Sequence, residues 1–424
     1  MKNFKKIIAV VLALVMITAT FAACGGNKEP TGGEKVLSID EVEKTVPKAS
    51  APVAKEDIKV GFIFLHDENS TYDKNFMDAA KAVQAKLGLR DDQVMFKVNI
   101  GENDACYNAA AELVDAGCDV IFADSFGHEP YIVKAAKEFT DVQFCHATGT
   151  TAQTSLVPNF HNAFASIYEG RYLAGVAAGL KLNEMIEAGK ITAEQAKMGY
   201  VGAFPYAEVK SGFTSFYLGA KSVCPTVTME VKYTNSWFDI ALEKESALAL
   251  IKNGCVLISQ HADSEGAPKA CEENGIPNIA YNVDTAKELK CENTAIISSK
   301  ISWEPYFELM ITSVIEGKVI PSDWCGGIKE GSVQLTALNE KAAAPGTQAK
   351  LDEVKASLEN GTIKVFDVNN FTVKGEKLTT YKADIVTDDK FTPDSEAISD
   401  GAFAESSKRS APYFDIIIDG ITEI

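Results

Sequence analysis

The sequence predicts two α/β lobes, each a mostly parallel sheet with helices on both faces, joined by a hinge around a ligand cleft. Three observations support this fold class. Short β-rich runs alternate with helical patterns from residue 58 onward. Several of these runs are almost continuously apolar, as strands buried on both faces of a parallel sheet are. The alternation pauses over a long helical stretch at 163–188 and then begins again, so the chain holds two sets of elements with right-handed crossovers.

The first set of elements runs from residue 58 to residue 149. Strands are expected at 58–65, 93–100, 119–126 and 141–149. Apolar residues recur at helical spacing over 75–87 and the pattern stops at Gly88. A second helix is expected from Asp104, which suits an N-cap, to Gly117, and a third over 130–139.

The second set follows the stretch at 163–188. Strands are expected at 198–204, 228–236, 255–264, 276–284 and 294–302. Helices are expected over 209–223 and 239–253, the latter with Asp239 as N-cap and Gly254 as its stop, and a short helix follows residue 264. Beyond these elements we expect a helix over 347–359 and then an acidic appendage on the outside of a lobe.

These patterns predict the domain organisation of the whole chain. A signal peptide occupies 1–23, and a lipidated Cys24 with a flexible tether occupies 24–56. Lobe 1 is expected at 57–195 plus 300–330, lobe 2 at 196–299, and a C-terminal extension packed on the lobes at 331–424.

The N-terminal residues have the pattern of a secretion signal. Lys2, Lys5 and Lys6 precede an apolar run that ends at Ala23, and this run is shorter than the ~20 residues that span a bilayer. The Phe-Ala-Ala before Cys24 resembles the bacterial lipoprotein signal, in which the cysteine becomes the lipid-bearing first residue; the alternative is an ordinary signal with an incidental cysteine. We therefore expect a protein held on the extracytoplasmic face of the cell membrane by a lipid anchor only.

Charge, cysteine and histidine content make several kinds of partner and site unfavourable. The formal net charge is −18, which disfavours nucleic acid and anionic membrane surfaces. The eight cysteines after Cys24 contain no C-x-x-C and predict free, buried thiols. The five histidines lack metal-ligand spacing, so no metal and no cofactor is expected.

Signatures of common enzymes are absent from the sequence. There is no G-x-G-x-x-G after a strand, no phosphate-binding G-x-x-x-x-G-K-[ST], no G-x-S-x-G and no H-E-x-x-H. Carboxylates follow several strands, at Asp67, Asp124, Asp263 and Asp284. They are suited to acid–base catalysis, but capping a helix or accepting a ligand hydrogen bond is the commoner role, and we predict that the protein is not an enzyme.

The residues at the carboxyl ends of the predicted strands are aromatic and polar. They read His66-Asp67, Asp124-Ser125-Phe126, Phe204-Pro205-Tyr206, Asn235-Ser236-Trp237, Gln260-His261 and Asn282-Val283-Asp284. In open parallel sheets ligands bind outside these ends. The mixture suits a cleft for a flat polar solute.

Several distinctive blocks occur together and in order: "IFADSFGH" (121–128), "HATG" (146–149), "YEGRYLAGVAAG" (168–179), "GYVGAFPYAEV" (199–209), "NSWFD" (235–239) and "QHADS" (260–264). With these blocks the sequence resembles, over about 59–331, the BMP family of basic-membrane-protein-like solute-binding lipoproteins of ABC importers. The resemblance implies two Rossmann-like lobes of the type I periplasmic-binding-protein kind and a purine nucleoside or purine base as ligand.

The resemblance also implies binding residues. Tyr72 stands where this subgroup usually has a tryptophan, and Asn282 stands where it usually has an aspartate, two residues before the retained Asp284. The other positions that match family motifs are Ser125, Phe126, Phe204, Glu208, Trp237, His261 and Asp263. Our hypothesis is that Tyr72, Phe126 and Trp237 stack on the ligand. Asp284, Glu208 or His261 would then read its polar edge.

Each of these residues also has a structural alternative. Phe126 and Phe204 suit a core as well as a ligand contact, and Trp237 suits packing between helix and sheet. Trp303 and Tyr306 open the helix after the last strand, where bracing the hinge is favoured over lining the cleft.

The predicted function is therefore capture of a purine nucleoside or nucleobase and its delivery to the permease and ATPase subunits of an ABC importer. Three alternatives stay open. The same fold suits another small solute, such as a sugar, a vitamin or a signalling molecule. A surface-anchored enzyme is less favoured, and a sensor that reports to a membrane kinase differs only in its partner.

Overall fold

Two parallel sheets organise the protein and confirm the predicted fold class. The computed structural model describes residues 36–387 and 390–424, so Cys24 and the predicted signal peptide lie outside the described residues. Residues 37–424 form one compact unit. None of the helices in the described part of the chain has the length and apolar character needed to cross a membrane.

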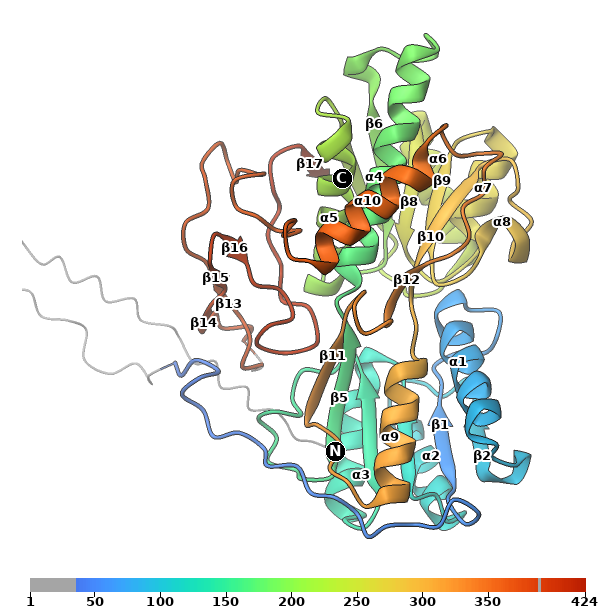
Figure 1. The fold of residues 1–424 in the computed structure, drawn as a ribbon, viewed down its shortest axis with the longest axis vertical. Helices are drawn as coiled ribbons and strands as arrows, with labels where there is room; N and C mark the ends of the chain where they lie inside the picture. The colour runs from blue at the N-terminus through green and yellow to red at the C-terminus, as the bar shows by residue number, and fades with distance from the viewer. Residues whose placement is uncertain (1–35, 388–389) are drawn as a thin grey trace, which may run out of the picture. The chain divides into compact units, whose positions relative to one another are not determined.

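The first sheet is six-stranded and parallel, in the order β11-β5-β4-β3-β1-β2. Its strands are β1 (Val60–Ile63), β2 (Val94–Lys97), β3 (Val120–Ala123), β4 (Gln143–Ala147), β5 (Phe160–Ala165) and β11 (Asp323–Gly326). The helices α1 (Thr71–Leu87), α2 (Asp104–Asp115), α3 (Glu129–Glu138) and α9 (Glu304–Glu316) pack with it. We call this part lobe 1 (Figure 1).

The second sheet is seven-stranded, in the order β12-β10-β9-β8-β6-β7-β17, and only β12 runs antiparallel to its neighbour. Its strands are β6 (Lys197–Gly202), β7 (Thr228–Tyr233), β8 (Leu257–His261), β9 (Asn278–Tyr281), β10 (Ala295–Ile301), β12 (Val333–Leu335) and β17 (Ile421–Glu423). The accompanying helices are α4 (Ile167–Glu187), α5 (Ala207–Val223), α6 (Ile240–Lys252), α7 (Gly266–Asn274), α8 (Thr285–Glu288) and α10 (Thr347–Glu359). We call this part lobe 2.

Local sequence signals account for most helix ends. The Ser70 side chain accepts the N–H of Asp73 and begins α1, and Gly88 ends this helix with φ of 66°. The predicted cap Asp239 accepts the N–H of Leu242. At α2 the prediction was one residue late, because Asn103 rather than Asp104 is the N-cap.

Helix α4 belongs with lobe 2, although its residues were predicted in lobe 1. It packs against α5, β10, β12 and α10 (Figure 1). Glycines make this contact close: a Cβ on Gly175 would lie 2.0 Å from the carbonyl oxygen of Phe216, and one on Gly219 would lie 2.0 Å from that of Tyr172. A hydrophobicity pattern records that α4 is buried but not which sheet buries it.

The chain passes between the lobes at three places. The connections are β5 to α4 at Ser166, β10 to α9 at Ser302, and β11 to β12 over 327–332. Hydrogen bonds tie them together, from Ser166 N–H to Gly326 O (2.9 Å) and from Ser302 N–H to Ser332 O (2.7 Å). Trp303 lies beside this hinge in the core, stacked on Phe76 at 4.4 Å, and therefore braces rather than lines the cleft.

The segments outside the two predicted lobes are more integrated than expected. Residues 37–56, predicted as part of a flexible tether, lie on the body: Ile39 is buried and donates its N–H to Ser395 Oγ at 2.9 Å. Within the predicted extension, β12 and β17 form the two edges of the second sheet, and Phe366 stacks on Phe414 at 4.5 Å. Four two-residue strands complete this part, at Lys382–Ala383, Ser395–Glu396, Ile398–Ser399 and Ala402–Phe403.

Candidate ligand-binding site

A cleft lies between the lobes where the strand order of each sheet reverses, between β1 and β3 in lobe 1 and between β6 and β8 in lobe 2. Lobe 1 contributes Leu65, Tyr72, Ser125, Phe126 and Thr148, and lobe 2 contributes Glu208, Trp237, His261, Asp263 and Tyr281. Thr148 has φ of 67°, which is strained for a β-branched residue. Such strain is commonly retained at functional sites.

Aromatic rings from both lobes form one wall of the cleft. Phe126, 40% exposed, lies 5.8 Å from Tyr206 between ring centroids, across the lobe boundary. Phe204 stacks on Tyr206 at 5.2 Å and meets Trp237 edge-on at 5.1 Å. This arrangement presents flat apolar faces to a solute that enters between the lobes.

Tyr72 of α1 contributes a further aromatic ring to the lining of the cleft. Its hydroxyl donates to the backbone carbonyl of Asp124 at 2.9 Å, and its ring meets Phe76 edge-on at 4.8 Å. Burial, with the nearby Glu208 carboxylate, raises the pKa of Tyr72 well above its ordinary value, so the phenol is neutral. Because the hydroxyl is held, the ring has a fixed orientation in the cleft.

Glu208 and His261 form a polar pair on the lobe 2 side. Glu208 lies in the first turn of α5, and its Oε1 is 3.4 Å from Nε2 of His261. Burial and the positive charge of Arg171 lower the pKa of His261, so the ring is neutral at pH 7. The pair therefore offers a carboxylate acceptor beside a neutral imidazole, suited to a ligand with N–H and ring-nitrogen groups.

Asp263 and Tyr281 form the floor of the cleft. The Tyr281 hydroxyl donates to Oδ1 of Asp263, and both side chains are buried. Burial raises the pKa of Asp263 and that of Tyr281 well above their ordinary values. On its other side the Tyr281 ring packs under Arg171, whose Cζ lies 4.2 Å from the ring centroid.

Glu243 supports this floor and makes stability pH-dependent. Its carboxylate accepts the N–H of Ser264 at 3.1 Å, and burial raises the pKa of Glu243 from 4.5 to about 7. Between these values the folded protein binds the proton that the unfolded chain releases, so the free energy of unfolding falls as pH rises from 4.5 to 7. The group contributes about 3 kcal/mol to this fall.

Glu243→Gln should flatten that dependence. Denaturant unfolding at pH 5 and pH 7.5 is expected to show a larger loss of stability for the native protein than for this variant, whose side chain does not titrate. Glu245→Gln, on the exposed side of the same helix, is the matched control and should keep the native dependence. Equal slopes for the native protein and Glu243→Gln would contradict the assignment.

The lobes are closed on each other in this structure. The cleft has a volume of only about 20 Å³, which is room for about one water. Polar contacts cross it, including Thr71 N–H to Asp263 O at 2.9 Å and Lys74 Nζ to Glu288 Oε2 at 3.1 Å. A larger solute can enter only when the lobes part or the aromatic side chains turn.

The structure brings most of the predicted binding residues together. Tyr72, Ser125, Phe126, Glu208, Trp237 and His261 line the cleft. Phe204 lies behind the lining, against Tyr206 and Trp237. Whether these side chains bind a ligand stays a prediction.

Asp284 lies outside the lining, contrary to its predicted place. Its side chain accepts the N–H of Lys287 as N-cap of α8, and Oδ2 pairs with Lys287 Nζ at 3.0 Å. The lining also includes Asp263, which matched a family motif, and three residues that were not predicted, Leu65, Thr148 and Tyr281. Leu65 is the last residue of the predicted strand 58–65, and Thr148 is the last but one of the predicted strand 141–149, which was the available signal.

Two further groups of side chains bear on alternative chemistry. Among residues 36–387 and 390–424, no cluster of three or more His, Cys, Asp or Glu side chains suits a metal ion. The eight cysteines of this part of the chain are free thiols.

Comparison with known proteins identifies relatives of the whole two-lobe region. The family model described as "ABC transporter substrate-binding protein PnrA-like" (Bmp) matches residues 63–369. A purine-binding protein of Brucella abortus is 32% identical over 76% of this chain and 89% of its own length. Basic membrane protein D of Borreliella burgdorferi is 22% identical over 69% of this chain and 84% of its own.

Solved structures agree on the fold. A solute-binding protein of an ABC transporter from Aeropyrum pernix superposes with a TM-score of 0.59 at 17% identity, covering 73% of this chain and 93% of that one. A solute-binding protein from Conexibacter woesei gives a TM-score of 0.58 at 20% identity, with 72% and 98% covered.

Proposed function

Because the chain belongs to the PnrA-like family of substrate-binding proteins of ABC transporters, we propose that it captures a purine nucleoside or nucleobase in the cleft between its lobes. The observation that carries the proposal is the aromatic lining contributed by both lobes, with Tyr72 and Phe126 from one and Trp237 from the other. The Brucella abortus relative, whose name records purine binding, supports the same ligand class.

The physical properties of a purine match this lining. Stacking of an aromatic side chain on a base contributes ~1–3 kcal/mol, and a hydrogen bond to a charged group contributes ~1.5–3 kcal/mol. Rings from both lobes and acceptors such as Glu208 together supply enough for micromolar binding, about −8 kcal/mol, after the entropic cost of association.

Delivery to a membrane transporter follows from the family. Substrate-binding proteins of this kind act outside the cytoplasmic membrane and hand a small molecule to permease subunits coupled to an ATPase. We propose that Cys24 carries the lipid that holds this protein at the membrane. Metabolic labelling with an alkyne-tagged fatty acid should mark the native protein and leave a Cys24→Ala variant unmarked.

The experiment that tests the ligand class is a thermal-shift series on the purified protein, unfolded and refolded to remove carried-over ligand. Adenine, hypoxanthine, adenosine, guanosine and inosine are compared with glucose and ribose. A ligand at 100 times its Kd adds about 2.7 kcal/mol to the free energy of unfolding. Stabilisation by one or more purines, without stabilisation by glucose or ribose, supports the proposal.

A sugar is the second candidate, because a putative glucose-binding protein of Haloferax volcanii is 34% identical over 51% of this chain and 51% of its own length. Stabilisation by glucose without any response to purines would overturn the purine proposal. It would leave the protein's membership of the family of substrate-binding proteins unaffected.

Nucleotides should bind much more weakly than the corresponding nucleosides. The acidic side chains that line the cleft in the described part of the chain are Glu208 and Asp263, and no Lys or Arg lines it. A phosphate brought into this site would lose its hydration beside the Glu208 carboxylate, with no lining cation to pair with it. Isothermal titration with guanosine and then GMP should show at least a tenfold loss of affinity, and equal affinities would contradict this account of the cleft.

A further inference from the structure

One residue of lobe 2 holds the start of a helix in lobe 1. Thr71 is the first residue of α1, and both its N–H (2.9 Å) and its hydroxyl (3.1 Å) donate to the backbone carbonyl of Asp263. Both residues are buried, at 6% and 5% exposure. The first N–H groups of a helix have no partner within it. In this protein one of them is satisfied across the cleft, so the bond exists only while the lobes are closed.

Lobe 2 fixes the position of that carbonyl from several directions. The N–H of Asp263 donates to Trp237 O at 2.8 Å, and the Asp263 carboxylate accepts the Tyr281 hydroxyl. The next residue, Ser264, is held by the Glu243 carboxylate. Asp263 is therefore a fixed acceptor rather than a mobile loop residue.

Arg171 supports this arrangement from behind the cleft. It is 1% exposed, its guanidinium lies over the Tyr281 ring, and Nη1 donates to Gln260 O at 2.8 Å. A buried charge is costly unless its contacts compensate. The contacts of Arg171 are with the ends of β8 and β9, which carry His261 and Tyr281 into the cleft.

We propose that Thr71 and Asp263 form the latch that holds the lobes closed, and that Tyr281 and Arg171 are positioning residues that aim Asp263 at it. The latch is also connected to the ligand site, since Tyr72 follows Thr71 directly and Asp263, Tyr281 and Trp237 line the cleft. A solute that contacts these side chains therefore contacts Asp263 itself and the residue next to Thr71. The connection between the latch and the ligand rests on the proposed function, whereas the latch itself does not.

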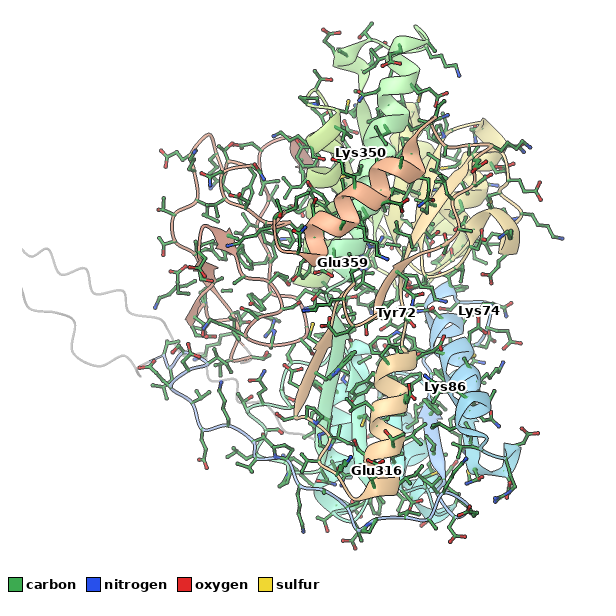
Figure 2. The ribbon with its side chains drawn as sticks, in the orientation of Figure 1. Tyr72, Lys74, Lys86, Glu316, Lys350 and Glu359 are labelled. Atoms are coloured by element: carbon green, nitrogen blue, oxygen red, sulfur yellow. The ribbon has the colours of Figure 1, made fainter. Side chains whose placement is uncertain are left out.

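A second cross-lobe pair, on the surface near the start of α1, provides an internal comparison. Lys74, labelled with Tyr72 in Figure 2, pairs with Glu288 of α8 at 3.1 Å, but the two side chains are 31% and 38% exposed. Exposed pairs contribute little. Lys74→Gln should therefore leave closure almost unchanged.

The test is amide hydrogen exchange of the first turn of α1 in the ligand-free protein. Thr71→Val removes the hydroxyl donor but retains the shape and the backbone N–H. It should raise exchange of this turn about fivefold, the factor expected from losing one net hydrogen bond of ~1 kcal/mol. Thr71→Ser and Lys74→Gln should match the native protein. Native exchange in Thr71→Val would overturn the latch.

Tyr281→Phe tests the positioning role separately. This variant leaves Thr71 intact in the other lobe and removes only the hydroxyl that holds the Asp263 carboxylate. Faster exchange at α1 supports positioning, because a loss of stability confined to lobe 2 would not change exchange in lobe 1. Native exchange at α1 would overturn the role of Tyr281.

The step that involves ligand is tested with saturating guanosine and saturating adenine added in turn. Slower exchange of the same turn in the native protein supports the coupling. Binding without any change in exchange overturns it. If no purine of the thermal-shift series binds, the proposed function fails, while the ligand-free comparison still decides whether the latch exists.

Discussion

Trp237→Ala is expected to weaken purine binding about 30- to 100-fold. Trp237 lines the cleft and meets Phe204 edge-on at 5.1 Å, so its removal takes away a stacking face and loosens the ring beside it. A central aromatic anchor of this kind contributes ~2–3 kcal/mol to binding. The change in Kd is measured by isothermal titration. The titrant is the purine that gives the native protein its largest thermal stabilisation.

Trp237→Phe is the matched variant for this prediction. It keeps an aromatic face at the same place and should lose less than tenfold in affinity. Near-native affinity of Trp237→Ala, with a native unfolding temperature, would show that the indole only packs between α6 and the sheet, the structural alternative that the sequence left open.

Gly175→Ala should strongly destabilise lobe 2, although it adds only one methyl group. The new Cβ would lie 2.0 Å from the Phe216 carbonyl oxygen, a backbone atom that side-chain rotation cannot relieve. The helices α4 and α5 would have to separate, and we expect a loss of at least about 3 kcal/mol, at the upper end of overpacking costs. Chemical denaturation monitored by circular dichroism measures it.

Gly189→Ala is the control for the α4 crossing. Gly189 has φ of 67° and no heavy atom within 4 Å of a built Cβ, so only the backbone conformation opposes the substitution. A cost of ~1–2 kcal/mol is expected from that source. If Gly175→Ala cost no more than Gly189→Ala, the close contact would not be rigid.

The fold was accessible from the sequence because its signals are local. Continuous apolar runs marked the buried strands, and the helix over 347–359 was predicted with the bounds that the structure shows. What failed was the assignment of segments to neighbours. Residues 163–165 of the stretch predicted as helical at 163–188 end β5 in lobe 1, whereas the rest forms α4, which packs against α5, β10, β12 and α10 in lobe 2. Likewise β17 lies far from β7 in sequence, and no local sequence pattern predicts that these two strands pair.

The candidate site was predicted as far as strand order allows. Residues at or just after the ends of strands near the switch points, such as Ser125, Phe126 and His261, do line the cleft. Asp284 lies outside the lining because its side chain is the N-cap of α8, where it accepts the N–H of Lys287. The sequence could not reveal Tyr281 as a lining residue, because strand periodicity does not distinguish the last core residue from the first cleft residue.

The pairing of β17 with β7 has a consequence for folding. Ile421 pairs with Met229, and Tyr233 donates to Glu423, a residue 190 positions later in the chain. Until that late segment docks, β7 presents an open backbone edge, which is a site for unwanted pairing with another chain. Closing so long a loop also slows assembly. The second sheet is therefore completed late, and its outer edge is where we expect the growing or refolding chain to be most prone to aggregation.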